Sequence, residues 1–258
     1  MTGAAATLWR RELTRFFRQP SRIAGAVGTP LLFWLLLGSG LSGSFHLPGG
    51  PADVSYLQYF FPGTIALVLL FAAIFSNISV IEDRHEGFLQ GVLVAPVSRL
   101  GIVAGKVLGG ATLAWLQGVV FLALAPASGV RLTAHSALAA AGILALLALS
   151  LTALGFAFAW KVDSVQGFHA IMNVVLMPMW LLSGSIFPVS GVPLWLGALM
   201  RINPLTYGIA ALRWTLSGPA ASRGSGLPGP AVSLGVTVAL GIAAFAACLW
   251  ATRGGRVE

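Results

Sequence analysis

Charged residues are scarce in this chain. They make up 9% of its 258 residues, whereas hydrophobic residues make up 57%. A typical soluble domain has about 25% charged residues, so these charges are too few to cover a soluble surface. The composition therefore excludes a soluble globular protein and a disordered one, and it predicts an integral membrane protein.

Cysteine and nucleotide-binding signatures are equally scarce. Cys248 is the single cysteine, so no disulfide can form within the chain. The four histidines have no cysteine or carboxylate at ligand spacing, which argues against a metal site. The chain also lacks a G-x-x-x-x-G-K-[ST] loop, and its nearest string, Gly105-Lys106, has neither the earlier glycine nor the following hydroxyl residue. We expect no catalytic residue, no cofactor and no ATP hydrolysis on this chain alone.

Carboxylates are missing from the long apolar stretches. Pumps driven by protons or sodium need titratable relays inside the membrane. The absence of carboxylates from these stretches argues against coupling of transport to protons or sodium ions and against a strongly cationic cargo. The excess of 15 basic over 7 acidic residues is accounted for by membrane topology, so we expect no nucleic-acid partner.

Long uncharged runs are what the sequence has in abundance. Six runs of 24 to 37 residues contain no Asp, Glu, Lys or Arg, and a helix needs about 20 apolar residues to cross a membrane. We predict an all-α integral membrane protein with six transmembrane helices near residues 22–42, 58–80, 104–126, 135–160, 165–186 and 230–252. With the N-terminus inside, 11 of the 15 basic residues fall on the inner side, so both termini are expected in the cytoplasm.

Two segments outside these spans carry their own patterns. Residues 7–19 interleave large apolar side chains with four arginines, which predicts an amphipathic helix along the inner membrane face; a simple positive anchor is the alternative. Residues 187–229 continue the longest run and hold helix-interrupting glycines and prolines. We interpret them as a re-entrant outer hairpin, with an ordinary interfacial loop as the alternative.

Polar residues within the spans are candidates for a substrate path. His169 and Asn173 are four residues apart and share one helix face, and polar groups inside a membrane are often functional. Helix–helix hydrogen bonding is the alternative role. An intramembrane serine protease built on Ser183 or Ser185 is disfavoured, because no histidine follows to act as the base. The candidate path residues are Asn77, Gln117, His169 and Asn173.

The loop between the second and third spans concentrates charge. Residues 82–87 hold three of the seven acids, and an apolar flank follows them. A short helix of this kind between two spans predicts a docking element whose carboxylates pair with a partner's Arg or Lys. The alternative is a solvated turn that merely ends the second span.

These segments together resemble the membrane subunits of ATP-binding-cassette exporters of the second type, a family with permeases for drugs, polysaccharides, nodulation lipids and other amphiphiles. The resemblance covers nearly the whole chain and rests on motifs that occur in the family's order. They are Phe61-Pro62-Gly63, Glu82-Asp83-Arg84 through Gly87 to Ala95-Pro96-Val97-Ser98-Arg99, Gly105-Lys106, Leu182-Ser183-Gly184 with Phe187-Pro188, and Ile202-Asn203-Pro204-Leu205-Thr206-Tyr207 followed by Arg213.

The resemblance implies an exporter that moves an amphipathic drug, lipid or lipid-linked glycan across the bacterial cytoplasmic (inner) membrane. Its partners would be two cytoplasmic ATPase subunits, which carry ATP and Mg²⁺, and a second permease that is either another copy of this chain or a paralogue. The single permease domain, residues 1–258, then divides into a connecting helix (1–21), spans one and two (22–80), a coupling-helix loop (81–100), spans three to five (101–186), the outer hairpin (187–229), and span six with the tail (230–258).

The resemblance also implies roles for individual residues. For ATPase coupling they are Glu82, Asp83, Arg84, Glu86, Gly87, Pro96 and Arg99. For the outer gate they are Pro188, Asn203, Pro204, Tyr207 and Arg213. Two readings outside this family stay open: a self-contained channel or secondary carrier that needs no ATPase, and a membrane anchor or assembly factor that transports nothing.

Overall fold

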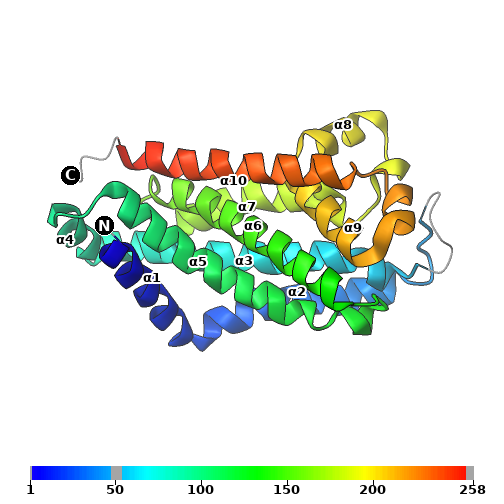
Figure 1. Cartoon of the computed structure of the whole chain (residues 1–258), viewed down its shortest axis with the longest axis horizontal. Coiled ribbons are helices and arrows are strands. Elements are labelled where there is room, and N and C mark those ends of the chain that lie inside the picture. The colour runs from blue at the N-terminus through cyan, green and yellow to red at the C-terminus, as the bar shows by residue number, and fades with distance from the viewer. Residues whose placement is uncertain (1, 48–53, 254–258) are drawn as a thin grey trace.

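The computed structural model describes residues 2–47 and 54–253, and every regular element there is helical (Figure 1). The α-helices are α1 (Thr2–Phe17), α2 (Pro20–Gly40), α3 (Tyr56–His85), α4 (Phe88–Val94), α5 (Arg99–Leu122), α6 (Ala134–Ala159), α7 (Val165–Trp180), α8 (Leu194–Ile202), α9 (Pro204–Gly224) and α10 (Pro230–Arg253). Short 3₁₀ turns occupy Ala125–Ser128 and Val189–Gly191.

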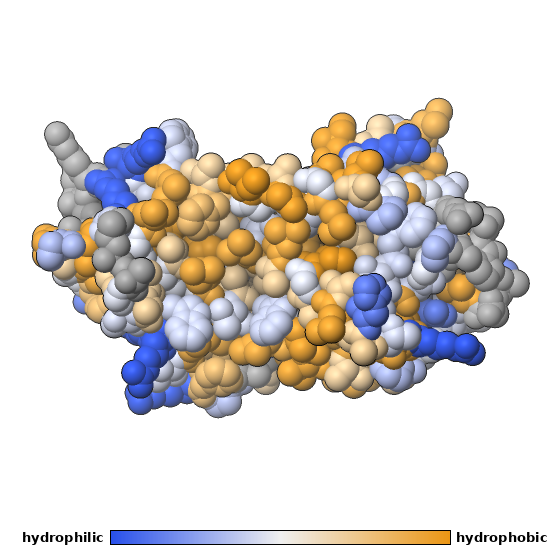
Figure 2. Space-filling model, in the orientation of Figure 1, coloured by the Kyte–Doolittle hydropathy of each residue, from blue (hydrophilic) through white to orange (hydrophobic). Residues whose placement is uncertain are grey.

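Five helices are long and apolar enough to cross a membrane. They are α3, α5, α6, α7 together with the turn that follows it, and α10. The first predicted span corresponds to α2, whose apolar part covers only 24–40, so the sixth span stays a prediction. Hydrophobic side chains cover the middle of the face in Figure 2, and the most hydrophilic ones gather toward the ends. The fold is that of an all-helical, multi-pass membrane protein.

Helix α3 is the centre of the bundle. Its most apolar window is 89% buried, because α2, α5, α6 and α7 pack around it. Ser55 begins the helix by accepting a hydrogen bond from the Gln58 amide, with 3.2 Å between the two atoms. Since α3 is 30 residues long, its two ends reach opposite ends of the molecule.

The first end of the molecule holds α4, the start of α1 and the last turn of α10 (Figure 1); we call it the α4 end. Helix α3 ends there at His85, and Gly87, two residues later, has a φ of 74°, which is left-handed and suits glycine. The docking element expected from residue 82 onward is therefore two pieces. Glu82 and Asp83 belong to the last turn of α3, Glu86 follows the helix directly, and the apolar residues form α4.

The opposite end holds α8 and the later part of α9 (Figure 1). Helix α7 is regular only to Trp180 and continues as a wide turn, Leu181–Ser185, in which Gly184 has a φ of 76°. The segment predicted as a hairpin, 187–229, consists mainly of α8 and α9. One side of α9 is fully buried through Leu205 and Leu212, and this helix packs against α6 and α10.

Candidate functional site

An ion-pair cluster joins three helices at the α4 end. Its centre is Asp83 of α3, which accepts two hydrogen bonds from Arg11, both of 2.7 Å, and one of 2.7 Å from Arg15. Both arginines belong to α1. Lys106 of α5 donates to Asp83 and, over 2.6 Å, to Glu12 Oε1. Asp83 is 0% exposed, so its negative charge is balanced entirely by cations of this chain.

Glycines on α5 allow this cluster to form. A Cβ at Gly105 would lie 2.8 Å from the Ala5 carbonyl oxygen, and one at Gly109 would lie 2.7 Å from Glu12 Cβ. Only residues without a side chain let α1 approach α5 so closely. The approach brings the Glu12 carboxylate within reach of Lys106, and the Ser79 hydroxyl donates to its other oxygen over 2.7 Å.

The cluster also reaches α4. The Arg11 guanidinium lies 3.8 Å from the centre of the Phe88 ring, a distance typical of a cation–π contact. Its hydrogen bonds to Asp83 raise the pKa of Arg11, which keeps the guanidinium charged. Helices α1, α3, α4 and α5 are thus connected through one arginine and its partners.

The three acids of this segment differ in accessibility. Asp83 was expected to pair with a cation of a partner, but its carboxylate is buried and paired inside the chain. The Glu82 side chain is partly covered and pairs with Arg15 over 2.8 Å. The Glu86 side chain is 59% exposed, with Arg15 at 3.5 Å. Of the three, Glu86 presents the most accessible negative charge.

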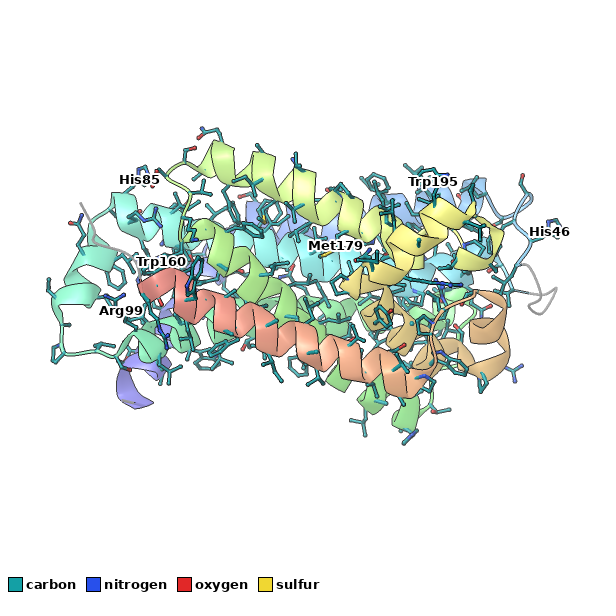
Figure 3. The ribbon with its side chains drawn as sticks, turned by 90° about the horizontal axis from the view of Figure 1, so that it is seen from above. His46, His85, Arg99, Trp160, Met179 and Trp195 are labelled. Atoms are coloured by element: carbon teal, nitrogen blue, oxygen red, sulfur yellow. The ribbon has the colours of Figure 1, made fainter. Side chains whose placement is uncertain are left out.

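Arg84 and His85 point to a different neighbour, the α6–α7 loop. Arg84 donates to the carbonyl oxygens of Ala159 and Val162, both over 3.2 Å, to that of Trp160, and to Asp163 Oδ1 over 3.1 Å. His85 Nε2 donates to the Asp163 carbonyl oxygen over 2.6 Å. Figure 3 shows His85 and Trp160 at the same end of the molecule.

The remaining residues assigned to coupling surround α4. Arg99, which begins α5, donates to the Thr252 carbonyl oxygen in the last turn of α10, and Pro96 is exposed in the connection before it. Between α1 and α4 lies an open cleft of about 410 Å³. Its lining is almost wholly apolar: Ala4, Thr7, Leu8, Phe88, Gly91, Val92, Ala95 and Val97.

At the opposite end, side chains from α3 and from the α8–α9 junction bind carbonyl oxygens in and beside the wide turn. In a regular helix these carbonyl oxygens would accept backbone hydrogen bonds. Here they accept hydrogen bonds from side chains instead. Tyr59 donates to the Gly184 carbonyl over 2.9 Å, and Tyr56 donates to the Ile186 carbonyl over 3.0 Å. Asn203 donates to the Met179 carbonyl over 2.5 Å.

A close approach between α3 and the turn completes this capping. A Cβ at Gly63 would lie 2.5 Å from Ser185 Cβ, so the contact requires glycine. Trp180 Nε1 donates to the Gly63 carbonyl oxygen over 2.8 Å. Three of the family-like motifs, which begin at Phe61, Leu182 and Ile202, thus meet at one place.

Arg213 lies at the centre of this second site. It is 2% exposed, and its Nη2 donates to the carbonyl oxygens of Tyr59 and Gly184 over 3.1 and 3.0 Å. Its guanidinium stacks 4.0 Å from the centre of the Tyr59 ring. Among the described residues, no carboxylate pairs with it, and Nε and Nη1 have no hydrogen-bond partner.

The other residues assigned to the gate lie around this centre. Pro204 begins α9, and Tyr207 donates to the Arg201 carbonyl oxygen of α8 over 2.8 Å. Pro188 lines a cleft of about 340 Å³ together with Tyr56. Ser183 and Ser185 are buried and bonded to each other over 2.7 Å, which suits a structural role in the turn.

The four candidate path residues do not share one surface. Asn77 is buried and donates to the carbonyl oxygens of Ala73 and Thr152 over 2.8 and 3.1 Å, which joins α3 to α6. Gln117 is buried and donates along its own helix. His169 is half-buried beside the Phe75 ring, whereas Asn173 is exposed. Only the last two leave an accessible polar face, on α7.

The sequence reasoning missed the cluster partners Arg11, Glu12, Arg15 and Lys106. Two local signals pointed to them. Glu12 is the one acid of an otherwise basic amphipathic segment, and Lys106 is a lone cation between small residues at the edge of a span. Neither signal indicated that the two side chains would meet.

Comparison with known proteins identifies one family that this chain matches. The pattern of the ABC-2 type transporter family matches residues 4–217. The inner membrane transport permease YadH of Escherichia coli (strain K12) is 27% identical over 223 residues, which cover 83% of each chain. Nodulation protein J of Rhizobium leguminosarum bv. trifolii is 29% identical over 209 residues, 80% of this chain and 78% of its own. The transport permease ycf38 of Cyanophora paradoxa is 27% identical over 212 residues, 81% of this chain and 73% of its own.

Proposed function

We propose, from the premise that the chain belongs to the ABC-2 type transporter family, that it is the transmembrane subunit of an ATP-driven exporter. Similar chains are named transport permeases, in keeping with a membrane transport subunit. ATP hydrolysis, in this proposal, takes place on two separate cytoplasmic ATPase subunits. The cargo is an amphipathic molecule that moves out of the cytoplasm or the inner leaflet of the bacterial inner membrane.

The α4 end is the cytoplasmic end in this proposal. Helix α2 then serves as the first of six spans, and both termini lie in the cytoplasm. Helix α1 lies along the inner membrane face, with Trp9 and Phe17 toward lipid and Arg10 and Arg18 toward the headgroups. The exposure of these side chains on adjacent faces of α1 supports the assignment.

The observation that carries the proposal is the attachment of α4. Its apolar cleft against α1 suits an apolar element of the ATPase. Glu86 is accessible beside it for a cation of that subunit, while Gly87, Pro96 and Arg99 fix the two ends of the loop. Because the buried cluster ties α1 and α5 to the last turn of α3, a force on α4 reaches three helices at once.

The cargo would pass along α7. Its polar face carries Asn173, the ninth residue of the helix, which lies about 12 Å along the axis from its start, near mid-membrane. An exposed amide at that depth is unfavourable against lipid. We propose that it faces the cargo path and a second permease, and that the capped wide turn forms the exit gate.

Purification of the chain from its native membrane in mild detergent tests this function. A stoichiometric subunit with a Walker A sequence is expected, and charge reversal by Glu86→Lys is expected to weaken its binding or its coupling to transport. The matched control is Lys161→Glu, which reverses an exposed charge of the other inner loop and leaves the acceptors of Arg84 in place. If the chain purifies without an ATPase and still moves solute in vesicles, the self-contained channel or carrier is correct.

The topology has a separate test. A cysteine at Ser44 is expected to react with a membrane-impermeant thiol reagent added outside, and a cysteine at Ser98 is not. The reverse labelling pattern would show the opposite membrane orientation, with α4 outside the cell.

A further inference from the structure

Neighbouring residues at the end of α3 hold different parts of the molecule. Asp83 holds α1 and α5 through its cations. Arg84 and His85 hold the loop that joins α6 to α7, through five acceptors between Ala159 and Asp163. The last turn of α3, directly before α4, therefore has two separate sets of contacts.

Helix α7 is the least buried of the five candidate spans, although Phe168 in its first turn packs into the core. The most apolar window of the α7 span is 22% buried, against 89% for α3. Only five residues, 160–164, join α6 to α7, and Ser164 begins α7 by accepting a hydrogen bond from the Gly167 amide over 3.0 Å. A displacement of so short a loop moves the first turn of α7 with it.

The opposite end of α7 is tied to the same helix. Trp180 donates to Gly63 and Tyr59 donates to Gly184, so α3 holds the α7 span near both of its ends. In between, the Phe75 and His169 rings are 6.4 Å apart. Helix α7 is thus suited to follow α3 rather than α6, although α6 is its neighbour in the chain.

We propose that Arg84, assisted by His85, is the positioning residue that transmits the displacement of α4 to α7. The proposal rests on the proposed function, because it takes the force on α4 from an ATPase. The two sets of contacts then have separate roles. Through Asp83, the displacement reaches α1 and α5. Through Arg84, it reaches α7, the helix on which Asn173 faces the cargo.

The chemistry of the contact favours arginine over lysine. The guanidinium is a planar fork, and it bonds several carbonyl oxygens at once in a fixed direction. A lysine at this position would keep the charge but form a single, mobile point contact. Transmission should therefore fail in Arg84→Lys as well as in Arg84→Gln, which separates a geometric role from a purely electrostatic one.

Spin-label distances within the chain provide the test. One pair of labels is placed at Gln166 of α7 and Ile242 of α10, and a second pair at Thr14 of α1 and Ile242, all of them exposed positions. The buried Cys248 is replaced by alanine. The chain is purified with its ATPase, diluted with unlabelled chain to remove contacts between copies, and measured with and without ATP and vanadate.

The proposal expects both distances to change on ATP trapping in the otherwise unsubstituted chain. Arg84→Gln and Arg84→Lys abolish the α7 change and keep the α1 change, with ATPase binding intact. Asp163→Asn keeps both changes, because it removes one exposed carboxylate and leaves the carbonyl contacts.

Two results would overturn the proposal. An unaltered α7 change in Arg84→Gln would show that another contact moves this helix. Loss of both changes in that variant would show general damage rather than selective transmission. A bound ATPase with no ATP-dependent change at either pair, already in the otherwise unsubstituted chain, would instead contradict the proposed function itself.

Discussion

The two ends of α3 bind arginine side chains in different ways. At the α4 end, Arg11 and Arg15 meet the carboxylate of Asp83. At the wide turn, Arg213 meets two carbonyl oxygens and the face of Tyr59. The first arrangement depends on balanced charges, and the second on neutral acceptors.

This difference suggests which end holds firm and which end opens. Separating a buried ion pair leaves an uncompensated charge, which costs about 3–5 kcal/mol. At the wide turn the acceptors of Arg213 are neutral carbonyl oxygens, so water can replace them without leaving an opposite charge unpaired, at a net cost of about 1.5–3 kcal/mol per bond. We therefore expect α1, α3 and α5 to move as one body at the α4 end, while the capped turn opens and closes.

The largest expected effect is that of Lys106→Met. This change leaves the Glu12 carboxylate buried without its closest cation, so the free energy of unfolding should fall by about 3–5 kcal/mol. The double variant Glu12→Gln/Lys106→Met removes both charges and should recover part of the loss. Unfolding in mixed detergent measures both variants.

The control for this prediction is Lys161→Met. Lys161 is exposed and lies 4.2 Å from the centre of the Trp250 ring, a contact worth about 0.5–1 kcal/mol at an exposed site. A Lys106→Met variant as stable as this control would contradict the idea that charge balance holds the α4 end together.

An intermediate effect is expected for Gly63→Ala. The added methyl would overlap Ser185, and overpacking of this kind costs about 1–3 kcal/mol. Adding Ser185→Gly removes the contacts with Ser185 Cβ and Oγ but leaves the backbone Cα 2.9 Å from the added methyl, so it should restore only part of the stability and transport. Gly28→Ala is the matched control, because a Cβ at Gly28 of α2 meets no atom within 4 Å; alanine there should stabilise the helix slightly. Equal losses in the two alanine variants would mean that the close approach is unimportant.

The smallest effect on stability is expected for Arg213→Met. Methionine keeps most of the apolar volume, and the Gly184 carbonyl oxygen retains its bond from Tyr59, so the loss should be about 1–2 kcal/mol. Transport should nevertheless fall, because the turn loses the bond that links Gly184 to α9. A loss as large as that of Lys106→Met would remove the distinction between the two ends.

The positions of the helices were largely predictable from the sequence. Each stretch predicted as a span overlaps a helix, because the length of an apolar run determines both the prediction of a span and the formation of a long helix. The starts and ends of the helices were predicted less accurately. The helix of the third predicted span, α5, begins at Arg99 rather than near residue 104, because Ser98 caps it by accepting a hydrogen bond from the Gly101 amide over 3.1 Å. This helix also tolerates Arg99 and Lys106 outside its apolar core.

The contacts of the two sites were not predictable in the same way. The motifs around Gly63, Gly184 and Arg213 were recognisable separately, but nothing local indicates that Gly63 makes room for Ser185. The pairing of Glu12 with Lys106 depends on how closely α1 approaches α5. Asn77 was expected beside the cargo and instead joins two helices, since the pattern of a span does not reveal which of its faces is buried.

The most direct test is whether ATP at the α4 end opens the turn at the other. A cysteine at Ser183, which is buried in the turn, is introduced with Cys248→Ala, and the chain is reconstituted with its ATPase. A membrane-impermeant maleimide added on the α8 side should label this cysteine faster when ATP is trapped with vanadate than without nucleotide. Equal labelling rates, in a complex that hydrolyses ATP, would contradict the coupling of the two ends.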